Sequence, residues 1–330
     1  MSVFQPCFSF CFYGVLKRFP WEIKIMSLTK VDWFGFRTKA TPHATLEGLR
    51  GVFSDVGSGI RVNPRKRGWM GFEQSADISI GQMHIGLMAF GGDSQKGWVS
   101  VNISGRGCEW VRDWDSASDI ASTLPQFEAR RVDLALDTYQ REVTHNKVMR
   151  AHRDGLFTTC GRPPEAVQIQ STDKCAGRTV YIGSRDQGKF LRAYEKGFEL
   201  VKSYANGDEI THIDGYPVED IYRLELELKP KLSPLPVDLI PRRDEYFSGA
   251  YPYLQKVIDI EPEVWQQKRE RGPQMDLEAS LSQIKHQYGS SLFTAVAAYQ
   301  GDIGAVWNKI VGTRHNEHLL EKGVLLVDHT

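Results

Sequence analysis

The sequence predicts an α+β fold in which a central antiparallel sheet is flanked by helices. Short stretches of alternating apolar and polar residues recur from Lys30 onward, bounded by Gly, Pro, Asn and Asp, as in strands joined by turns. Helical segments and long hairpins separate these stretches without a strict strand–helix alternation, which disfavours a doubly wound parallel sheet. After residue 230 the pattern changes to helical periodicity, which predicts a helical C-terminal region.

Individual elements follow from the same patterns. We expect strands at Val31–Arg37, Gly97–Ser104, Arg131–Asp137, Arg178–Ser184, Phe190–Lys196 and Tyr222–Lys229. We expect helices at Ala44–Phe53, Ser118–Phe127 and Asn146–Asp154. Residues 1–27 show neither period and are expected to be peripheral, and Met26 is a candidate alternative start.

A proline-rich stretch, Lys229–Pro241, indicates a domain boundary near residues 230–255, which divides the chain into a main domain, 28–230, and a helical region, 231–330. Within the helical region an apolar stripe recurs at three- and four-residue steps, and Asp276 stands where an N-cap or first-turn acid belongs. The stripe consists of Leu277, Leu281, Ile284 and Tyr288. It is either core or an interface.

Composition limits the functions open to the chain. Its 330 residues are 41% hydrophobic and 25% charged, enough for one large or two ordinary domains. The 41 basic and 41 acidic residues balance, so binding to nucleic acid has to depend on local basic clusters. The five cysteines form no Cys-x-x-Cys pair, which argues against a disulfide framework and a thiolate zinc site. No apolar run approaches the roughly 18 residues of a membrane helix, so we expect a cytoplasmic protein without membrane contact.

Two of the expected strands place carboxylates on one face. Because side chains alternate along a strand, Asp133 and Asp137 share one face of their strand, and Glu225 and Glu227 share one face of theirs. If these strands are neighbours, the repulsion among the acids would be relieved by a cation, and oxygen ligands select Mg²⁺, Mn²⁺ or Ca²⁺. The alternative is a half-solvated sheet with charged outer positions.

A third strand could carry a nucleophile. In FLRAYEK the side chains of Arg192, Tyr194 and Lys196 are expected to project together. Cations beside a phenol lower its pKa and also hold a phosphate, which suits a tyrosine that attacks a phosphodiester. The alternatives are an ordinary strand tyrosine or Tyr181 as the nucleophile, with Arg185 as its nearest cation.

The densest basic run is a candidate for DNA contact. In the loop RVNPRKRGW, four cations precede a tryptophan that could stack on an unpaired base. These residues are Arg61, Arg65, Lys66, Arg67 and Trp69. The alternative is that this loop is a solvated turn that does not contact DNA. Further basic groups are Arg185, the pair Arg242 and Arg243, and the run Lys268–Arg271.

The order of these motifs resembles the replication initiation factor family, the rolling-circle initiators of small plasmids and filamentous bacteriophages. The resemblance covers residues 28–230 and rests on Asp32 in an early VDW strand, then SVNISGRGCEW, RVDLALD, TVYIGSRDQGKFLRAYEKG and YRLELELK. The later segment QYGSSLFTAVAAYQGD resembles the phage branch. The nine histidines include no His-hydrophobic-His motif, which separates the chain from the histidine-metal nickases.

The resemblance implies a site-specific nickase on a sheet related to other rolling-circle nickases, with residues 28–230 as the nicking domain and 231–330 binding DNA or a partner. It implies that Tyr194 attacks one strand at a double-strand origin, becomes linked to the 5′ phosphate and frees a 3′ hydroxyl primer, while Arg192 and Lys196 orient the phosphate. It also implies Mg²⁺ or Mn²⁺ on the acids Asp133, Asp32, Glu225, Asp137 and Glu227, with Asp133 foremost.

The implied partners are partly unpaired origin DNA, a host helicase and polymerase, and a second copy of the chain. Two alternatives stay open. One is a non-catalytic DNA-binding regulator on the same scaffold. The other is a metal-dependent phosphodiesterase that uses the same acids to activate water and forms no covalent intermediate.

Overall fold

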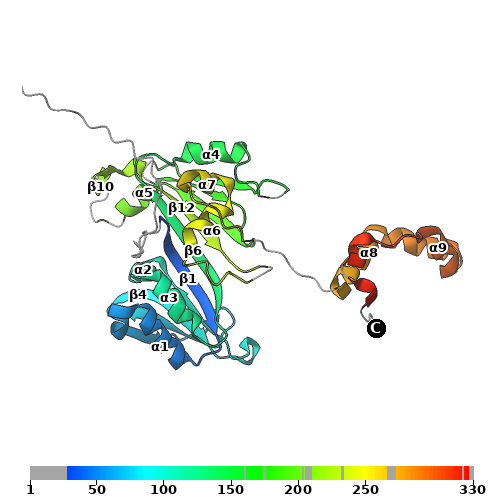
Figure 1. Ribbon diagram of the computed structural model, residues 1–330, viewed down its shortest axis with the longest axis horizontal. Coiled ribbons are helices and arrows are strands. Elements are labelled where there is room, and N and C mark those ends of the chain that lie inside the picture. The colour runs from blue at the N-terminus through cyan, green and yellow to red at the C-terminus, as the bar shows by residue number, and fades with distance from the viewer. Residues whose placement is uncertain are drawn as a thin grey trace, which may run out of the picture. The chain divides into compact units, whose positions relative to one another are not determined.

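The computed structural model describes residues 28–159, 161–173, 176–202, 204, 210–231, 234–265, 273–321 and 323–326. The chain divides into two compact units, Met1–Pro230 with Pro234–Trp265, and Lys231–Ser233 with Gln266–Thr330 (Figure 1). The N-terminal segment with the candidate start at Met26 and the basic residues 268–271 lie outside the described residues.

A ten-stranded sheet organises the first unit, and each neighbouring pair of strands is antiparallel, which confirms the predicted fold class. Its order is β2-β3-β4-β5-β1-β6-β12-β9-β8-β7. The strands are β1 (Lys30–Thr38), β2 (Ile60–Pro64), β3 (Gln74–Ile80), β4 (Met83–Phe90), β5 (Val99–Ile103), β6 (Glu128–Thr138), β7 (Ala166–Gln170), β8 (Arg178–Ile182), β9 (Lys189–Tyr194) and β12 (Tyr222–Leu228). A separate hairpin joins β10 (His212–Ile213) to β11 (Tyr216–Pro217).

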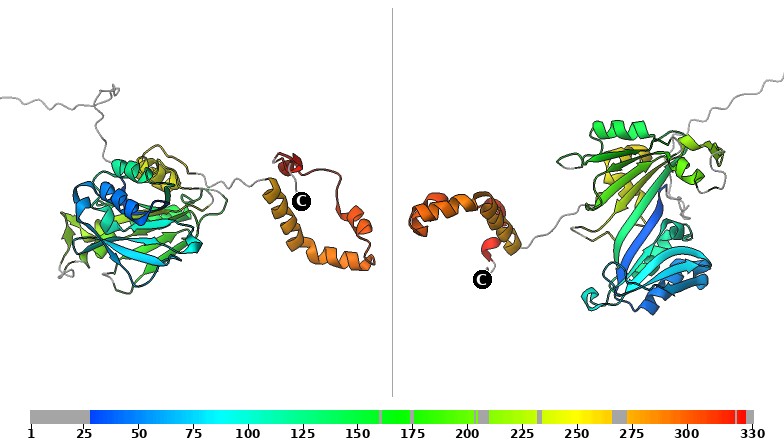
Figure 2. Two further views of the ribbon diagram at one scale, coloured as in Figure 1. Left: turned by 90° about the horizontal axis from the view of Figure 1, so that it is seen from below. Right: turned by 180° about the vertical axis from the view of Figure 1, so that it is seen from behind.

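Helices of the first unit pack around this sheet, and the left view of Figure 2 shows α1, α3, α6 and α7 on one side of it. They are α1 (Pro42–Val52), α2 (Gly105–Cys108), α3 (Trp114–Ser122), α4 (His145–Arg153), α5 (Lys196–Val201), α6 (Arg243–Ala250) and α7 (Pro252–Ile258). The 3₁₀ turns are η1 (Ser54–Gly59), η2 (Asp93–Gln95) and η5 (Val218–Asp220). The core contains the apolar strand residues together with helix residues such as Leu49, Val148 and Phe247.

The alternating strands behave as their patterns require. Leu224 and Leu226 of β12 are fully buried in the core, and Leu134 of β6 lies opposite Leu226. Their polar neighbours along the chain therefore lie on the other face of the sheet. This arrangement separates an apolar, helix-covered face from a face that carries the charged residues.

Element boundaries differ from the expected ones by up to five residues; the largest difference is at α3, and the difference at β9 affects Lys196. Helix α3 begins at Trp114, earlier than the sequence indicated, because the Asp113 side chain caps it by accepting hydrogen bonds from the backbone N–H groups of Asp115 and Ser116. Strand β9 ends at Tyr194, and the chain then enters α5 at Lys196.

The border between the units also lies later than the proline-rich stretch suggested. Helices α6 and α7 belong to the first unit, where Phe247 and Leu254 are fully buried in the core. Asp244 fastens α6 to the start of β1 by accepting hydrogen bonds from the backbone N–H and the hydroxyl of Thr29, at 2.7 and 2.6 Å. Burial and hydrogen bonding thus outweigh the linker-like composition of residues 229–241.

The second unit is helical, with α8 (Pro273–Ala298), α9 (Ile303–Ile310), α10 (Glu317–Glu321) and the 3₁₀ turn η6 (Val324–Leu326). Asp276 falls in the first turn of α8. Three residues of the apolar stripe, Leu281, Ile284 and Tyr288, are exposed, so the stripe is not core within this unit. In the described part of the chain, none of the helices is both long and apolar enough to cross a membrane.

Candidate active site

Strand register brings the expected nucleophile and acids onto one face. Arg223 of β12 lies directly opposite Tyr194 of β9 and, on its other side, opposite Asp137 of β6. Two residues along β12, Glu225 lies opposite Arg192. Directly opposed residues share a face of the sheet, so these side chains meet on the face that α1, α3, α6 and α7 leave uncovered.

Tyr194 is held by hydrogen bonds from this face. Its hydroxyl donates to Oε2 of Glu225 at 3.3 Å. Arg192 donates to the same carboxylate oxygen at 2.6 Å and to the Tyr194 hydroxyl at 3.4 Å, and its guanidinium lies 4.6 Å from the centre of the tyrosine ring. Glu225 is therefore placed to accept the phenol proton, and Arg192 to hold an anion beside the oxygen.

The pKa of Tyr194 is raised, contrary to the expectation that its flanking cations lower it. Burial is the largest cause, because the residue is only 6% exposed, and the Glu225 carboxylate adds to the shift. Arg223 and Arg192 act in the opposite direction without overcoming burial. The resting phenol is therefore neutral.

Lys196 does not project as a strand residue, because β9 ends before it. It begins α5, pairs with Glu199 at 2.7 Å and keeps its Nζ 5.8 Å from the centre of the Tyr194 ring. Both expected cations therefore lie near the Tyr194 ring. Arg192 does so through strand alternation, whereas Lys196 does so because it begins α5.

Arg223 is a central residue of the site that motif reasoning did not assign. It is 7% exposed and binds Asp137 at 2.5 Å and Asp32 at 3.1 Å. Lys30 contacts Asp137 from β1 at 2.5 Å. The signal was present in the sequence, because Arg223 alternates with the leucines of its strand as Glu225 does.

A second arginine, Arg131, neutralises the other end of the face. It binds Asp133 at 2.5 Å and Glu227 at 2.9 Å, and its guanidinium lies 4.5 Å from the centre of the Trp33 ring. Lys229 contacts Glu227 at 2.5 Å. Each of the five expected acids therefore has a basic partner.

The acids do not converge around a cation position as expected. Among the described residues, no group of three His, Cys, Asp or Glu side chains is arranged to hold a metal ion. The reason is that arginines on the same face, in particular Arg131 and Arg223, stand between the carboxylates and compensate their charge. The donor chemistry still suits a hard cation, since the set offers only carboxylate oxygens.

The surroundings of Asp133 disfavour its charged form. Burial raises its pKa to about 6, although Arg131 lowers it, and the neighbouring acids Glu227 and Glu225 raise it further. By contrast, Arg223 and Lys30 hold the pKa of Asp137 below its usual value in spite of burial. Additional positive charge would thus be favourable at Asp133 rather than at Asp137.

The expected DNA-binding loop lies far along the sheet. Arg61 is on β2, an edge strand, and the residues from Arg65 to Trp69 connect it to β3, whereas β9 is separated from β2 by six strands. The basic residues of this loop and the tyrosine site nevertheless lie on one face of the sheet. A row of directly opposed residues, which share a face, crosses the sheet from β2 to β6: Asn63, Asp77, Leu87, Asn102, Gly35 and Arg131. Arg61 and Arg65 stand two residues to either side of Asn63 and share its face.

The remaining candidate residues lie at three different places in the first unit. Tyr181 lies opposite Arg192, so it shares the face of Tyr194. Arg185 lies in the β8–β9 turn, near the Phe190 ring and at the far end of β9 from Tyr194. Arg242 and Arg243 are engaged in ion pairs with acids of their own unit, which assigns them to the fold.

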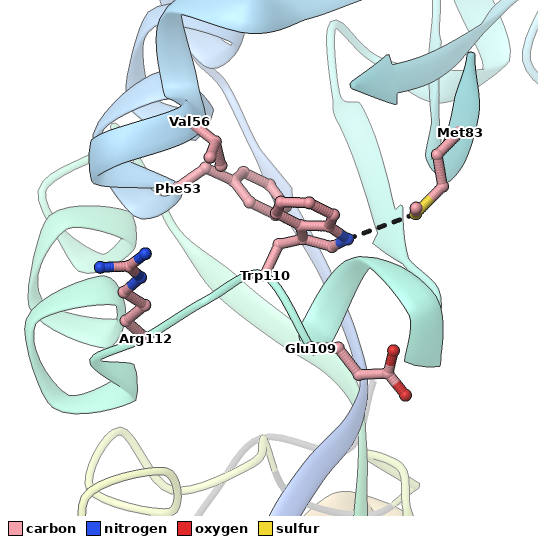
Figure 3. Close-up of a pocket in the computed structure, with 6 residues that line it drawn as sticks. All are labelled: Phe53, Val56, Met83, Glu109, Trp110 and Arg112. Carbon is pink, nitrogen blue, oxygen red and sulfur yellow. Dashed lines mark hydrogen bonds between the residues drawn. The ribbon is translucent and has the colours of Figure 1, made fainter. Parts of the chain in front are cut away.

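A cavity of about 420 Å³ lies elsewhere in the first unit (Figure 3). Its lining includes the Trp110 ring, whose Nε1 contacts the Met83 sulfur at 3.3 Å. Glu109 and Arg112 contribute charged groups to it. Four strands separate β4, which carries Met83, from β9, so the cavity is not part of the tyrosine site.

The raised pKa of Asp133 predicts a specific pH dependence of stability. The folded protein binds this proton more tightly than the unfolded chain, so the contribution is complete below about pH 4 and is lost as the pH rises through about 6. Between these values the free energy of unfolding of the wild type should fall by roughly 2–3 kcal/mol relative to Asp133→Asn. Urea unfolding at each pH measures the difference.

Asp137→Asn is the matched control. The pKa of Asp137 is lowered, so its stabilisation is present above the unfolded value and is lost only in more acidic solution. The difference between the wild type and Asp137→Asn should stay constant between pH 4 and 6. A constant difference for Asp133→Asn as well would contradict the assignment.

Comparison with known proteins assigns the chain to a family. No curated protein sequence matches the chain significantly. A solved structure of a rolling circle replication initiator protein from Geobacillus stearothermophilus is similar, with 18% identity, a TM-score of 0.46 and coverage of 61% of this chain and 74% of that one. The profile of the replication initiation factors matches residues 128–293, half of the chain, including β6, β9 and β12. The chain belongs to the replication initiation factor family.

Proposed function

We propose that this protein starts rolling-circle replication by nicking one DNA strand at an origin with Tyr194 as the nucleophile. The observation that carries the proposal is the hydrogen bond from the Tyr194 hydroxyl to Glu225, beside Arg192, on the face of the sheet that carries the charged residues. A phenol, a proton acceptor and a cation around one oxygen are the groups that attack on a phosphodiester requires.

The chemistry follows from these positions. Because burial keeps the Tyr194 phenol neutral, its proton has to leave as the oxygen attacks, and Glu225 is the acceptor within reach. A bond forms between the phenol oxygen and phosphorus, and the bond from phosphorus to the 3′ oxygen breaks. The 3′ oxygen takes a proton from water, which leaves a 5′ phosphotyrosine and a 3′ hydroxyl from which a host polymerase can extend.

Arginines would stabilise the phosphate during this step. The side chain of Arg192 is 31% exposed and covers the Tyr194 ring, so an incoming phosphate meets it first. Arg223 lies in the row between Tyr194 and Asp137 and adds a second positive charge. Planar guanidinium groups bind phosphate oxygens in pairs and thereby fix its orientation.

We also propose that Mg²⁺ or Mn²⁺ assists the reaction. Asp133 would hold it together with Glu227 and Glu225, because burial and these neighbouring acids disfavour the charged form of Asp133. Such an ion, when bound, offsets negative charge on the phosphate. Binding would require Arg131 to release Asp133 and Glu227, which it bridges in the free protein.

Origin DNA would lie along the face of the sheet that carries the charged residues. Seven steps between strands separate β9 from β2, which at about 4.8 Å each is roughly 34 Å along the sheet, the length of about ten base pairs. DNA nicked at Tyr194 could therefore also reach Arg61 and Arg65. A helicase and a second copy of the chain stay predictions from the family resemblance, as does membership of the phage branch.

Tyr194→Phe tests the nucleophile. The variant lacks only the hydroxyl, so it should bind origin DNA within about threefold of the wild type while losing the covalent adduct by at least about 1000-fold. The measurement is an adduct assay on a labelled supercoiled plasmid that carries the origin. Tyr181→Phe is the matched control and should form the adduct normally.

The same assay separates the alternatives. Free DNA ends without an adduct would indicate a phosphodiesterase that activates water. A mobility shift without cleavage would indicate a regulator. An adduct that persists in Tyr194→Phe and disappears in Tyr181→Phe would transfer the role to Tyr181.

Removal of divalent metal tests the proposed cation. With EDTA the rate of adduct formation by the wild type should fall at least about 100-fold, and added Mg²⁺ or Mn²⁺ should restore it. Asp133→Asn should require more metal for the same rate, because a ligand is lost, whereas Asp77→Asn, at a distant exposed acid, should not. A rate that EDTA leaves unchanged would contradict the proposal.

Salt dependence tests the DNA-binding loop. Each of Arg65→Gln, Lys66→Gln and Arg67→Gln should reduce the slope of log K against log salt concentration by about one unit if it removes one phosphate contact. Lys256→Gln is the control, because Lys256 is exposed on α7, on the helix-covered side. Three unchanged slopes would show that the loop does not touch the DNA.

A further inference from the structure

We propose that Tyr139 and Tyr216 form a stacking platform for an unpaired base of the DNA, close to the linkage that Tyr194 attacks. The inference rests on the proposed function, which it extends from the phosphate to its neighbouring nucleotides. The ligand is identified by its chemistry, a flat nucleobase on a single strand.

The two rings form a pair that remains open to solvent. Tyr139 directly follows β6 and Tyr216 begins β11, and their ring centres are 5.0 Å apart with an interplanar angle of 42°. Tyr139 is 36% exposed. Core pairs differ, since Phe34 and Phe36 have a similar spacing of 5.4 Å but are 0% and 1% exposed. Tyr139 therefore keeps exposed ring surface beyond the part that packs against Tyr216 of the hairpin.

Register places the pair at the nucleophile's end of the sheet. Asp137, Arg223 and Tyr194 stand in one row across β6, β12 and β9, and Tyr139 lies two residues beyond Asp137. Strand spacing puts the Cα of Asp137 about 10 Å across the sheet from that of Tyr194, and Tyr139 follows just past the end of β6. This separation is within a few nucleotides of the attacked linkage.

The charges around Tyr139 belong to the same network. Burial raises its pKa, the Asp137 carboxylate raises it further, and Arg223 lowers it. The Asp137–Arg223 ion pair beside Tyr194 therefore interacts electrostatically with the Tyr139 phenol. Lys30, whose side chain is 52% exposed, contacts Asp137 and could bind a phosphate that flanks the stacked base.

The platform is preorganised by its backbone. The Glu142 carboxylate accepts hydrogen bonds from the N–H groups of Tyr139 and Gln140 at 3.1 and 2.7 Å. Arg141 pairs with Asp220, just after the segment that carries Tyr216, and so ties the two ring-bearing segments together. Rings that are already fixed lose little freedom when a base stacks on them.

Two oligonucleotides isolate stacking from phosphate contact. One is labelled (dT)₁₂, and the other is a 12-mer of the same sugar-phosphate backbone without bases. Stacking on aromatic rings tolerates any base and contributes about 1–3 kcal/mol, so Tyr139→Ala in the full chain should weaken (dT)₁₂ binding about 5- to 150-fold. Binding of the abasic 12-mer should not change. Fluorescence anisotropy measures both affinities.

Further variants guard against misfolding. Tyr139→Leu keeps an apolar side chain against Tyr216 and should show the same selective loss, whereas Tyr139→Trp and Tyr139→Phe should keep wild-type affinity. Trp110→Ala, at an aromatic residue of the first unit that is 38% exposed and lies outside the tyrosine site, should bind both oligonucleotides as the wild type does.

Equal weakening of both oligonucleotides by Tyr139→Ala and Tyr139→Leu, or no weakening of either, would overturn the platform. Failure of the proposed function is a separate result, because (dT)₁₂ binding needs no nicking. The platform would be overturned with nicking intact if Tyr139→Leu bound (dT)₁₂ normally while the wild type still formed the Tyr194 adduct.

Discussion

The site depends on one physical constraint, the need to neutralise five carboxylates on a single face of a sheet. Arg131, Arg192 and Arg223 meet this need by pairing with acids on their own strand, on a neighbouring strand or, for Asp32, on the strand beyond it. Because a buried charge without a partner is costly, these pairs fix the side chains of β6, β9 and β12. The apolar face of the same strands joins the core, so folding and site assembly occur together.

This constraint also sets the chemical character of Tyr194. A phenol on an open surface would ionise more readily, but it could not hold a fixed position against an acceptor. Here burial keeps the proton on Tyr194, and the Glu225 carboxylate lies at hydrogen-bond distance from its hydroxyl. In the proposed reaction, the proton would leave Tyr194 at the moment of attack, when a phosphate would replace the lost solvation. The arginines that stabilise the fold are thus the groups that a phosphate would engage.

Much of this arrangement could be predicted from the sequence. Period-two patterns located β6, β9 and β12 and identified the shared face of Asp133, Asp137, Glu225 and Glu227. The order of motifs predicted the family. Patterns of this kind are reliable because alternation in a strand is a property of the local backbone. Strands β2, β3, β4 and β7 were not predicted. The signal was present in β2, β3 and β7, where IRVN, ADISI and VQIQ alternate apolar and polar residues. In β4 the residues are mostly apolar without alternation, and periodicity alone does not distinguish such a run from a buried helix.

By itself the sequence determined which side chains share a face, since strand geometry requires only local information. Only the tertiary structure decided how those side chains pair. It placed Arg131 and Arg223 between acids that repulsion would otherwise separate, ended β9 before Lys196, buried α6 and α7 in the first unit, and brought Tyr216 to Tyr139. These outcomes depend on contacts between residues far apart in the chain, whose energies no local pattern records.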